Sequence, residues 1–167
     1  NTLSLDEFYA ACPGNMVLSM SGSLVEENTS PQYFLKISLE GKDFQAFLNA
    51  LGLNVKTYTQ ATYRNAAITF NLSGNNSAVS VNDLKFLLDK MNIAGVAGVT
   101  FNTEGNIYEI QLAADSLNLD NYLPKAEFST AMENLREDIK SLSFLKWLNI
   151  NAKFKSDQLT FRNVTMS

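Results

Sequence analysis

The chain has 167 residues and a formal net charge of −4, it contains no histidine and one cysteine, and it is 46% hydrophobic and 18% charged. Such a length and apolar content suit one packed domain or a section of a larger repeating structure, and they argue against intrinsic disorder. The counts exclude histidine-dependent catalysis, histidine-ligated metals and an intrachain disulfide. The acidic balance disfavours a broad nucleic-acid-binding face, which needs clustered lysine and arginine.

The first predicted element is a short helix over residues 2–11. Apolar Leu5, Phe8 and Tyr9 have helical spacing, and a Pro-Gly pair follows the segment.

Two strands and a second helix are predicted next. Serine alternates with apolar residues over residues 16–26, and an apolar row alternates with polar residues over residues 32–40, so both segments are expected to be strands. Residues 42–51 have an amphipathic pattern that ends at Gly52, which predicts a helix.

The middle of the chain predicts an antiparallel meander. Its strands are expected at residues 64–73, 78–89, 92–102 and 107–114. Residues 103–106 are typical of a hairpin turn. Within the second of these strands, residues 83–88 are also compatible with a helical turn.

The last part of the chain predicts a long helix and a hairpin. Residues 127–148 contain a capping box and an apolar stripe, as amphipathic helices do. Residues 149–155 and 158–166 are expected to pair around Ser156-Asp157. We therefore expect a β-rich section over residues 1–126, an amphipathic helix over 127–148, and a terminal β-hairpin of the same domain over 149–167.

A short pattern recurs at residues 5–9, 44–48 and 119–123, in which an apolar residue precedes Asp or Gln, any residue, an aromatic residue and a bulky apolar residue. The spacing predicts one-turn helical plugs at strand ends, and chance recurrence at strand-to-helix junctions is the alternative. The predicted fold class is α+β, mainly β: an antiparallel, curved, meander-type sheet that a few short helices cover.

Neither a catalytic nor a metal site is predicted. The carboxylates are scattered, and Cys12 has no histidine, lysine or arginine near it in sequence, so we expect it to be a packing residue. We expect no enzyme activity, no metal and no cofactor.

The strongest signal is a set of apolar rows on successive strands. Such rows belong either to a closed protein core, which is the simpler interpretation, or to the inner face of a curved sheet that holds lipid acyl chains. The candidate lipid-facing residues are Tyr33, Leu35, Ile37, Ile68, Phe70, Tyr108, Ile110 and Leu112.

Three segments resemble the AsmA family of Gram-negative bacteria. The residues Leu117, Leu119, Asp120, Tyr122, Leu123 and Pro124 are similar to that family's recurrent "L-x-L-D-x-Y-L-P" segment. Residues 148–164 resemble its late hairpin, and residues 39–53 with 64–74 resemble its "F-L-x-x-L-G" helix and following strand.

The resemblance implies a location and a role. AsmA-like proteins are anchored in the inner membrane, project into the periplasm, and are related to bridge-like lipid transfer proteins whose long curved sheet forms an apolar groove. We therefore expect a non-catalytic periplasmic fragment, anchored by a region outside this sequence. It would form part of a larger elongated β-groove, and serve outer-membrane biogenesis and phospholipid transport.

Phospholipid acyl chains and other parts of the same longer chain are the partners that this implies. The alternative is a closed-core β-rich interaction module that assists outer-membrane protein assembly.

Overall fold

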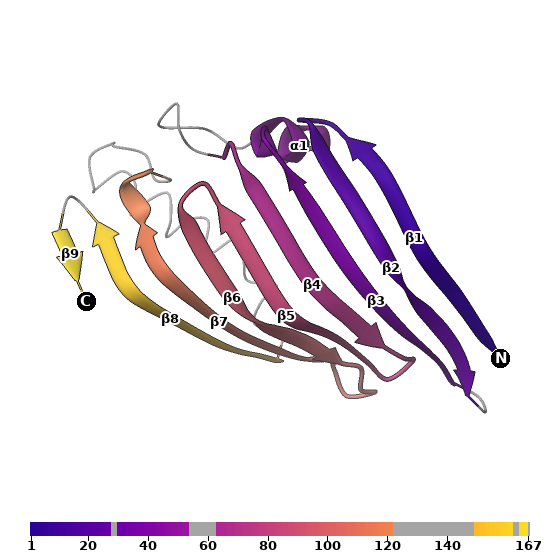
Figure 1. Cartoon of the computed structure of the whole chain (residues 1–167). Coiled ribbons are helices and arrows are strands. Elements are labelled where there is room, and N and C mark those ends of the chain that lie inside the picture. Colours follow the sequence, from indigo (N-terminus) through magenta and orange to yellow (C-terminus); the bar gives the residue numbers. More distant parts are fainter. Residues whose placement is uncertain (28–29, 54–62, 122–148, 162–163, 167) are drawn as a thin grey trace.

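The computed structural model describes residues 1–27, 30–53, 63–121, 149–161 and 164–166. In this part of the chain, nine strands form a single sheet in chain order, from β1 at one edge to β9 at the other (Figure 1). The strands are β1 (Thr2–Cys12), β2 (Met16–Glu27), β3 (Ser30–Gly41), β4 (Ala66–Gly74), β5 (Ala78–Leu88), β6 (Met91–Thr100), β7 (Ile107–Asn118), β8 (Asn149–Phe161) and β9 (Val164–Met166). A helix α1 (Phe44–Ala50) follows β3, and a 3-10 turn η1 (Leu119–Asn121) follows β7.

The pairing is antiparallel from β1 to β7 and again between β8 and β9, whereas β7 and β8 are parallel. A parallel neighbour needs a crossover connection rather than a tight turn, and residues 122–148 connect these two strands. The predicted mainly-β, antiparallel meander is therefore confirmed, with one parallel pair added at its end.

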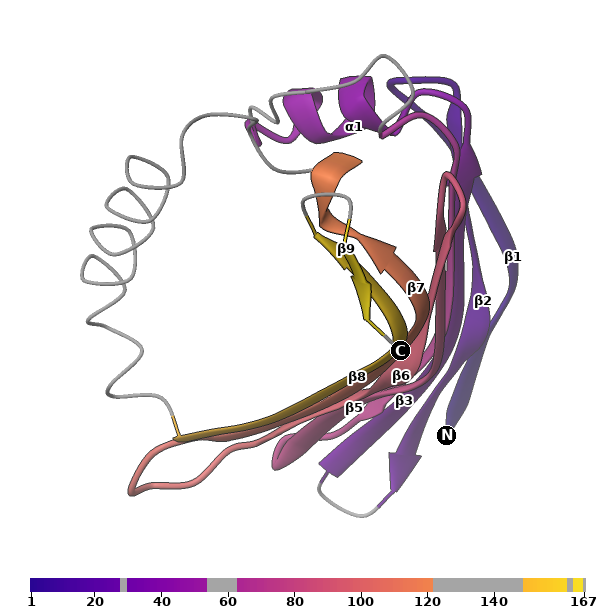
Figure 2. The same ribbon diagram turned by 90° about the vertical axis from the view of Figure 1, so that its left-hand side faces the viewer.

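The sheet is strongly curved, and α1 lies on its concave side (Figure 2). Strand twist and β-bulges both bend a sheet. Pairing shifts register between Leu5 and Phe8 in β1, between Thr69 and Asn71 in β4, and between Val81 and Leu84 in β5. We call the concave side, on which α1 packs, the inner face, and the opposite side the outer face.

The most tightly packed region lies where α1 meets the inner face. Phe44 is 7% exposed and clusters with buried Met16, Ala66 and Leu88. The Phe44 ring stacks on Phe47 at a centroid distance of 6.0 Å and meets Phe86 edge-on at 5.9 Å. The helix begins at Asp43, whose side chain accepts a hydrogen bond from the Ala46 N–H, as N-caps do.

The helix predicted over residues 2–11 is wrong, because this segment is β1. A bulge explains the error. Leu5 opposes Gly22 and Phe8 opposes Met20, so Asp6 and Glu7 together stand opposite one residue of β2. The extra residue separates the inner-face residues Leu5 and Phe8 by three positions instead of two, and a spacing of three is typical of a helix.

The terminal segment does end in an antiparallel strand pair, β8 with β9, but the turn predicted at Ser156-Asp157 is wrong. These two residues lie inside β8, which continues from Asn149 to Phe161. Strand β7 pairs with β8 on both sides of them, because Ala114 opposes Ser156 and Ser116 opposes Gln158. The neighbouring strand thus supplies the ladder that overrides a turn-like pair of residues.

The helical plugs have different outcomes. The first lies in β1 and is extended, the second is α1, and the third begins as η1, with residues 122–123 outside the described residues. Residues 83–88 belong to β5, so the alternative of a helical turn there is wrong. The helix predicted over residues 127–148 lies outside the described residues.

Candidate functional site

All eight predicted lipid-facing residues lie on the inner face. They come from β3, β4 and β7, and directly opposed residues of neighbouring strands share a face. One row of opposed residues crosses the sheet through Tyr33, Gly74, Val79, Val99 and Tyr108. A second row crosses it through Leu35, Leu72, Val81, Ala97 and Ile110. The sheet therefore brings together residues that are up to 79 positions apart (112 − 33) in the chain.

Each of the eight side chains is half-buried. The buried apolar residues of the described chain are instead Met16, Phe44, Ala66, Leu88 and Ala114, of which the first four form the cluster at α1. The inner face is thus closely packed at the α1 end and partly accessible along the predicted rows.

The apolar inner face is wider than the prediction. It also includes β1, β2, β5, β6 and β8, with members such as Leu3, Phe8, Met20, Leu24, Val81, Leu84, Phe86, Ile93, Val99, Ile150 and Phe154. Sequence reasoning recognised the alternation in β2 but did not include it among the sites. In β1 and β5 the bulges interrupt the alternation, and one extra residue transfers every later side chain to the other apparent face.

Two glycines let large inner-face side chains spread across the sheet. A Cβ on Gly95 would lie 2.8 Å from Leu112 Cδ2 and 2.2 Å from the carbonyl oxygen of Gln111. A Cβ on Gly74 would lie 2.4 Å from the hydroxyl of Tyr33. Tyr33 and Leu112 therefore cover the positions where a neighbouring side chain would stand, which makes the inner surface continuous.

The outer face is polar by contrast. Its serine row on β2 opposes Phe34, Lys36 and Ser38 of β3, and β4 continues with Thr69, Asn71 and Ser73. Some exposed apolar residues interrupt this pattern, namely Tyr9, Val17, Phe34, Leu87, Val96 and Ile107. The sheet therefore has one solvated face and one apolar face, as antiparallel sheets often do.

Hydrogen bonds to the backbone connect the segments at the α1 end of the sheet. The Asp89 carboxylate accepts hydrogen bonds from the backbone N–H groups of Tyr63, Arg64 and Asn65, at 2.9, 3.0 and 3.1 Å. The Phe44 N–H donates in turn to the Arg64 carbonyl at 3.0 Å. The β5–β6 turn, the chain that enters β4 and the first turn of α1 are thereby tied together.

A second aspartate ties β6 to β7. The Asp115 carboxylate accepts the Asn92 side-chain N–H at 2.6 Å and the Asn92 backbone N–H at 3.1 Å. These bonds favour the ionised form and lower the pKa of Asp115, the side-chain bond from Asn92 most strongly.

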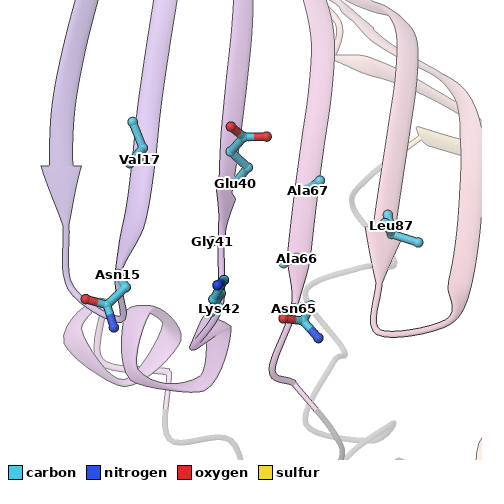
Figure 3. Close-up of a pocket in the computed structure, with 9 residues that line it drawn as sticks. All are labelled: Asn15, Val17, Glu40, Gly41, Lys42, Asn65, Ala66, Ala67 and Leu87. Atoms are coloured by element: carbon cyan, nitrogen blue, oxygen red, sulfur yellow. The ribbon is translucent and has the colours of Figure 1, made fainter.

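The outer face has a shallow hollow of about 740 Å³ near the α1 end (Figure 3). Small residues Gly41, Ala66 and Ala67 form part of its lining, beside the exposed Val17 and Leu87. None of the predicted site residues lines it. The hollow lies on the opposite side of the sheet from the candidate apolar surface.

No family model, curated protein or solved structure matches the chain. Among the residues that the structure describes, no helix is long and apolar enough to cross a membrane. In the same residues, no group of three or more histidine, cysteine, aspartate or glutamate side chains is placed to hold a metal ion.

Proposed function

We propose that the inner face of the sheet is a surface for phospholipid acyl chains and that the chain is a non-catalytic segment of an AsmA-like periplasmic protein. The observation that carries this proposal is the continuous apolar inner face, half-buried rather than fully packed along the eight predicted residues. Acyl chains need a continuous apolar surface and no particular polar partner, because their transfer from water is favourable in proportion to the area that is covered.

The chemistry of the inner face supports a ligand that is bound through its apolar part. From β3 to β7, the inner-face rows that cross the sheet contain no charged side chain. A charged headgroup placed on these rows would lose its hydration without a compensating partner. We therefore place the acyl chains on the rows and the headgroup at the rim, in water.

The position of α1 supports a direction for the acyl chains. The helix packs on one end of β2, β4 and β5 through Met16, Ala66 and Leu88. Acyl chains lying along the strands would meet α1. Acyl chains lying across the strands follow the apolar rows from one strand to the next, so we place them in that direction.

Photo-crosslinking tests this proposal. A benzophenone amino acid placed at Ile37, Phe70 or Ile110 should capture phospholipid when the protein is incubated with vesicles of phosphatidylethanolamine and phosphatidylglycerol. The matched controls carry the same probe at Ser38, Thr69 and Gln111, which are adjacent in sequence and belong to the outer face.

Capture at the three inner positions with little capture at the three outer positions is the expected result. Absence of lipid at all inner positions, or equal capture on both faces, would contradict the proposal. The alternative of a closed-core interaction module rests on the helix predicted over residues 127–148, which lies outside the described residues. That module would give protein–protein adducts at the inner positions instead of lipid adducts.

A further inference from the structure

Among the residues that the structure describes, the backbone groups at the two edges of the sheet have no neighbouring strand. Over the part of the chain that the structure describes, β1 is one edge, and β9 covers only the end of β8, from Leu159 to Phe161. Within the described residues, 149–158 of β8 therefore form a second edge with no strand beside it. An edge strand presents a row of N–H and C=O groups that can pair with another strand.

Exposed apolar side chains of the inner face lie on both edge strands, and on β2 beside the β1 edge Leu24 is 41% exposed as well. On β1, Leu3 is 69% and Phe8 42% exposed, and on β8, Ile150 is 40% and Phe154 55% exposed. All four belong to the inner face, because they oppose Leu24, Met20, Tyr108 and Leu112 respectively. The corresponding residues of the interior strands β3 and β7 are half-buried. A strand added at either edge would cover these side chains.

The outer faces of the two edges have opposite charge. The β1 bulge places exposed Asp6 and Glu7 together opposite Ser21 of the outer face. The Tyr9 hydroxyl, which is on the same face, donates to the Glu7 carboxylate. On β8, exposed Lys153 and Lys155 oppose Gln111 and Ala113. Exposed Asp157 follows on the same face, so the open part of β8 carries two positive charges and one negative charge, whereas β1 carries two negative charges.

We propose that copies of this chain associate head to tail, with β1 of one copy pairing with the open part of β8 of the next. The two strands run in the same direction, because six antiparallel pairings separate β1 from β7 and β8 is parallel to β7 (Figure 1). A second copy in the same orientation therefore presents β1 parallel to β8. The occupant of each edge is a second copy of this chain.

The side chains define a register for this pairing. With Ile150 beside Leu3, Ala152 falls beside Leu5, and the extra residue of the bulge brings Phe154 beside Phe8. Lys153 then faces Asp6 and Glu7 together on the outer face. The same register extends the apolar inner face from one copy to the next and pairs the charges on the outer face.

The association is heterologous, because two different edges meet. Each added copy presents a new free edge, so the oligomer grows with concentration instead of stopping at a dimer. This inference concerns self-association and does not depend on lipid binding, so the two proposals fail separately.

Charge exchange tests the proposal by sedimentation velocity over a protein concentration series. The wild-type chain of 18.5 kDa should form larger species as its concentration rises, and added salt should weaken them. The double variant K153E/K155E and the double variant D6K/E7K should each lose at least about tenfold in association constant, because like charges then meet at the interface. An equimolar mixture of the two variants should associate again. The acidic β8 edge of K153E/K155E then meets the basic β1 edge of D6K/E7K, and the two unchanged edges also have opposite charges.

The variant K36E/K85E is the matched control for K153E/K155E, since it makes the same change in net charge at exposed lysines of the interior strands β3 and β5. It should associate as the wild type does. A strictly monomeric wild type would overturn the proposal, and so would equal loss in the control or a mixture that stays monomeric. Circular dichroism of every variant shows whether it is folded.

Disulfide trapping tests the register in a C12S background. A chain that carries L3C and I150C should form a ladder of disulfide-linked species, because paired strands bring Cβ atoms within bonding reach. A chain with L3C alone should stay monomeric on a non-reducing gel. Efficient dimers of the L3C chain would show β1 pairing with β1 and would overturn the head-to-tail arrangement.

Discussion

At the scale of single residues, two aspartates hold the strand ends near α1 by accepting several N–H groups each. Asp89 accepts three backbone N–H groups and has a positive φ of 54°, a conformation that Asp, Asn and Gly adopt more readily than other residues. Asp115 accepts the backbone N–H and one side-chain N–H of Asn92 from the neighbouring strand. Both residues therefore fix connections between strands and leave the apolar surface free.

Substitution of Asp89 separates its bonding from its backbone conformation. Asp89→Gly keeps the positive φ accessible but removes the acceptor of three N–H groups, so we expect a loss of about 1–3 kcal/mol in the free energy of unfolding. Asp89→Asn tolerates the same φ and keeps one acceptor oxygen, and it should lose less. Urea unfolding measures both values, and a glycine variant as stable as the wild type would disprove the role of the carboxylate.

Asp115 predicts a pH dependence of stability. Its pKa is lowered from 3.8 in the folded chain, mainly by the Asn92 side chain. Its contribution to stability is therefore complete above the unfolded-state pKa and is lost as the pH falls through the lower folded-state pKa. We expect the free energy of unfolding of the wild type to decline more steeply below about pH 4 than that of Asp115→Asn.

Urea unfolding at a series of pH values from about 3 to 6 measures this difference. Asn92→Ala keeps the carboxylate but removes the side-chain donor that lowers its pKa most, so its slope should move toward that of Asp115→Asn. An Asp115→Asn variant with an unchanged slope would argue against the contribution of the Asn92 hydrogen bonds.

At the scale of elements, α1 determines how one end of the inner face is closed. Seven residues are too few for a stable isolated helix, so its stability comes from packing. The Phe44 ring provides this packing through Met16, Ala66 and Leu88, while the Asp43 cap and the backbone bond to Arg64 orient the first turn.

Phe44→Ala should lower the free energy of unfolding by about 3–5 kcal/mol, because it removes the buried ring and leaves a cavity under the helix. Chemical denaturation measures the loss. Asn49→Ala is the matched substitution on the exposed side of the same helix and should change stability by less than about 0.5 kcal/mol. Similar losses in the two variants would show that α1 is not anchored through its aromatic residue.

At the scale of the whole molecule, one curved sheet separates a polar outer face from an apolar inner face. A ligand that binds only the folded sheet must stabilise it by mass action. If acyl chains bind the inner face, a short-chain phosphatidylcholine at 100 times its dissociation constant should raise the free energy of unfolding by about 2.7 kcal/mol.

Thermal unfolding below the micelle concentration of the lipid measures this stabilisation. Glycerophosphocholine has the same headgroup without acyl chains and should leave the midpoint unchanged. A shift with both compounds would indicate recognition of the headgroup, and a shift with neither would argue against lipid binding by this segment.

The local alternation of side chains by itself determined much of this protein. It predicted β2, β3, β4, β6, β7 and α1 and placed Tyr33, Ile68 and Tyr108 with their neighbours in rows that share one face. These predictions succeed because successive side chains of a strand point to opposite faces. This alternation is a local property of the extended backbone and can be recognised from adjacent residues alone.

Only the tertiary structure decided the rest. The bulge at Asp6-Glu7 makes β1 look helical, and the parallel ladder with β7 carries β8 through Ser156-Asp157. Both depend on strands that are distant in sequence and supply the hydrogen bonds, so local propensity does not reveal them. The same long-range pairing brings β3 and β7 into one sheet and decides which apolar side chains are packed under α1 and which stay half-buried on the inner face.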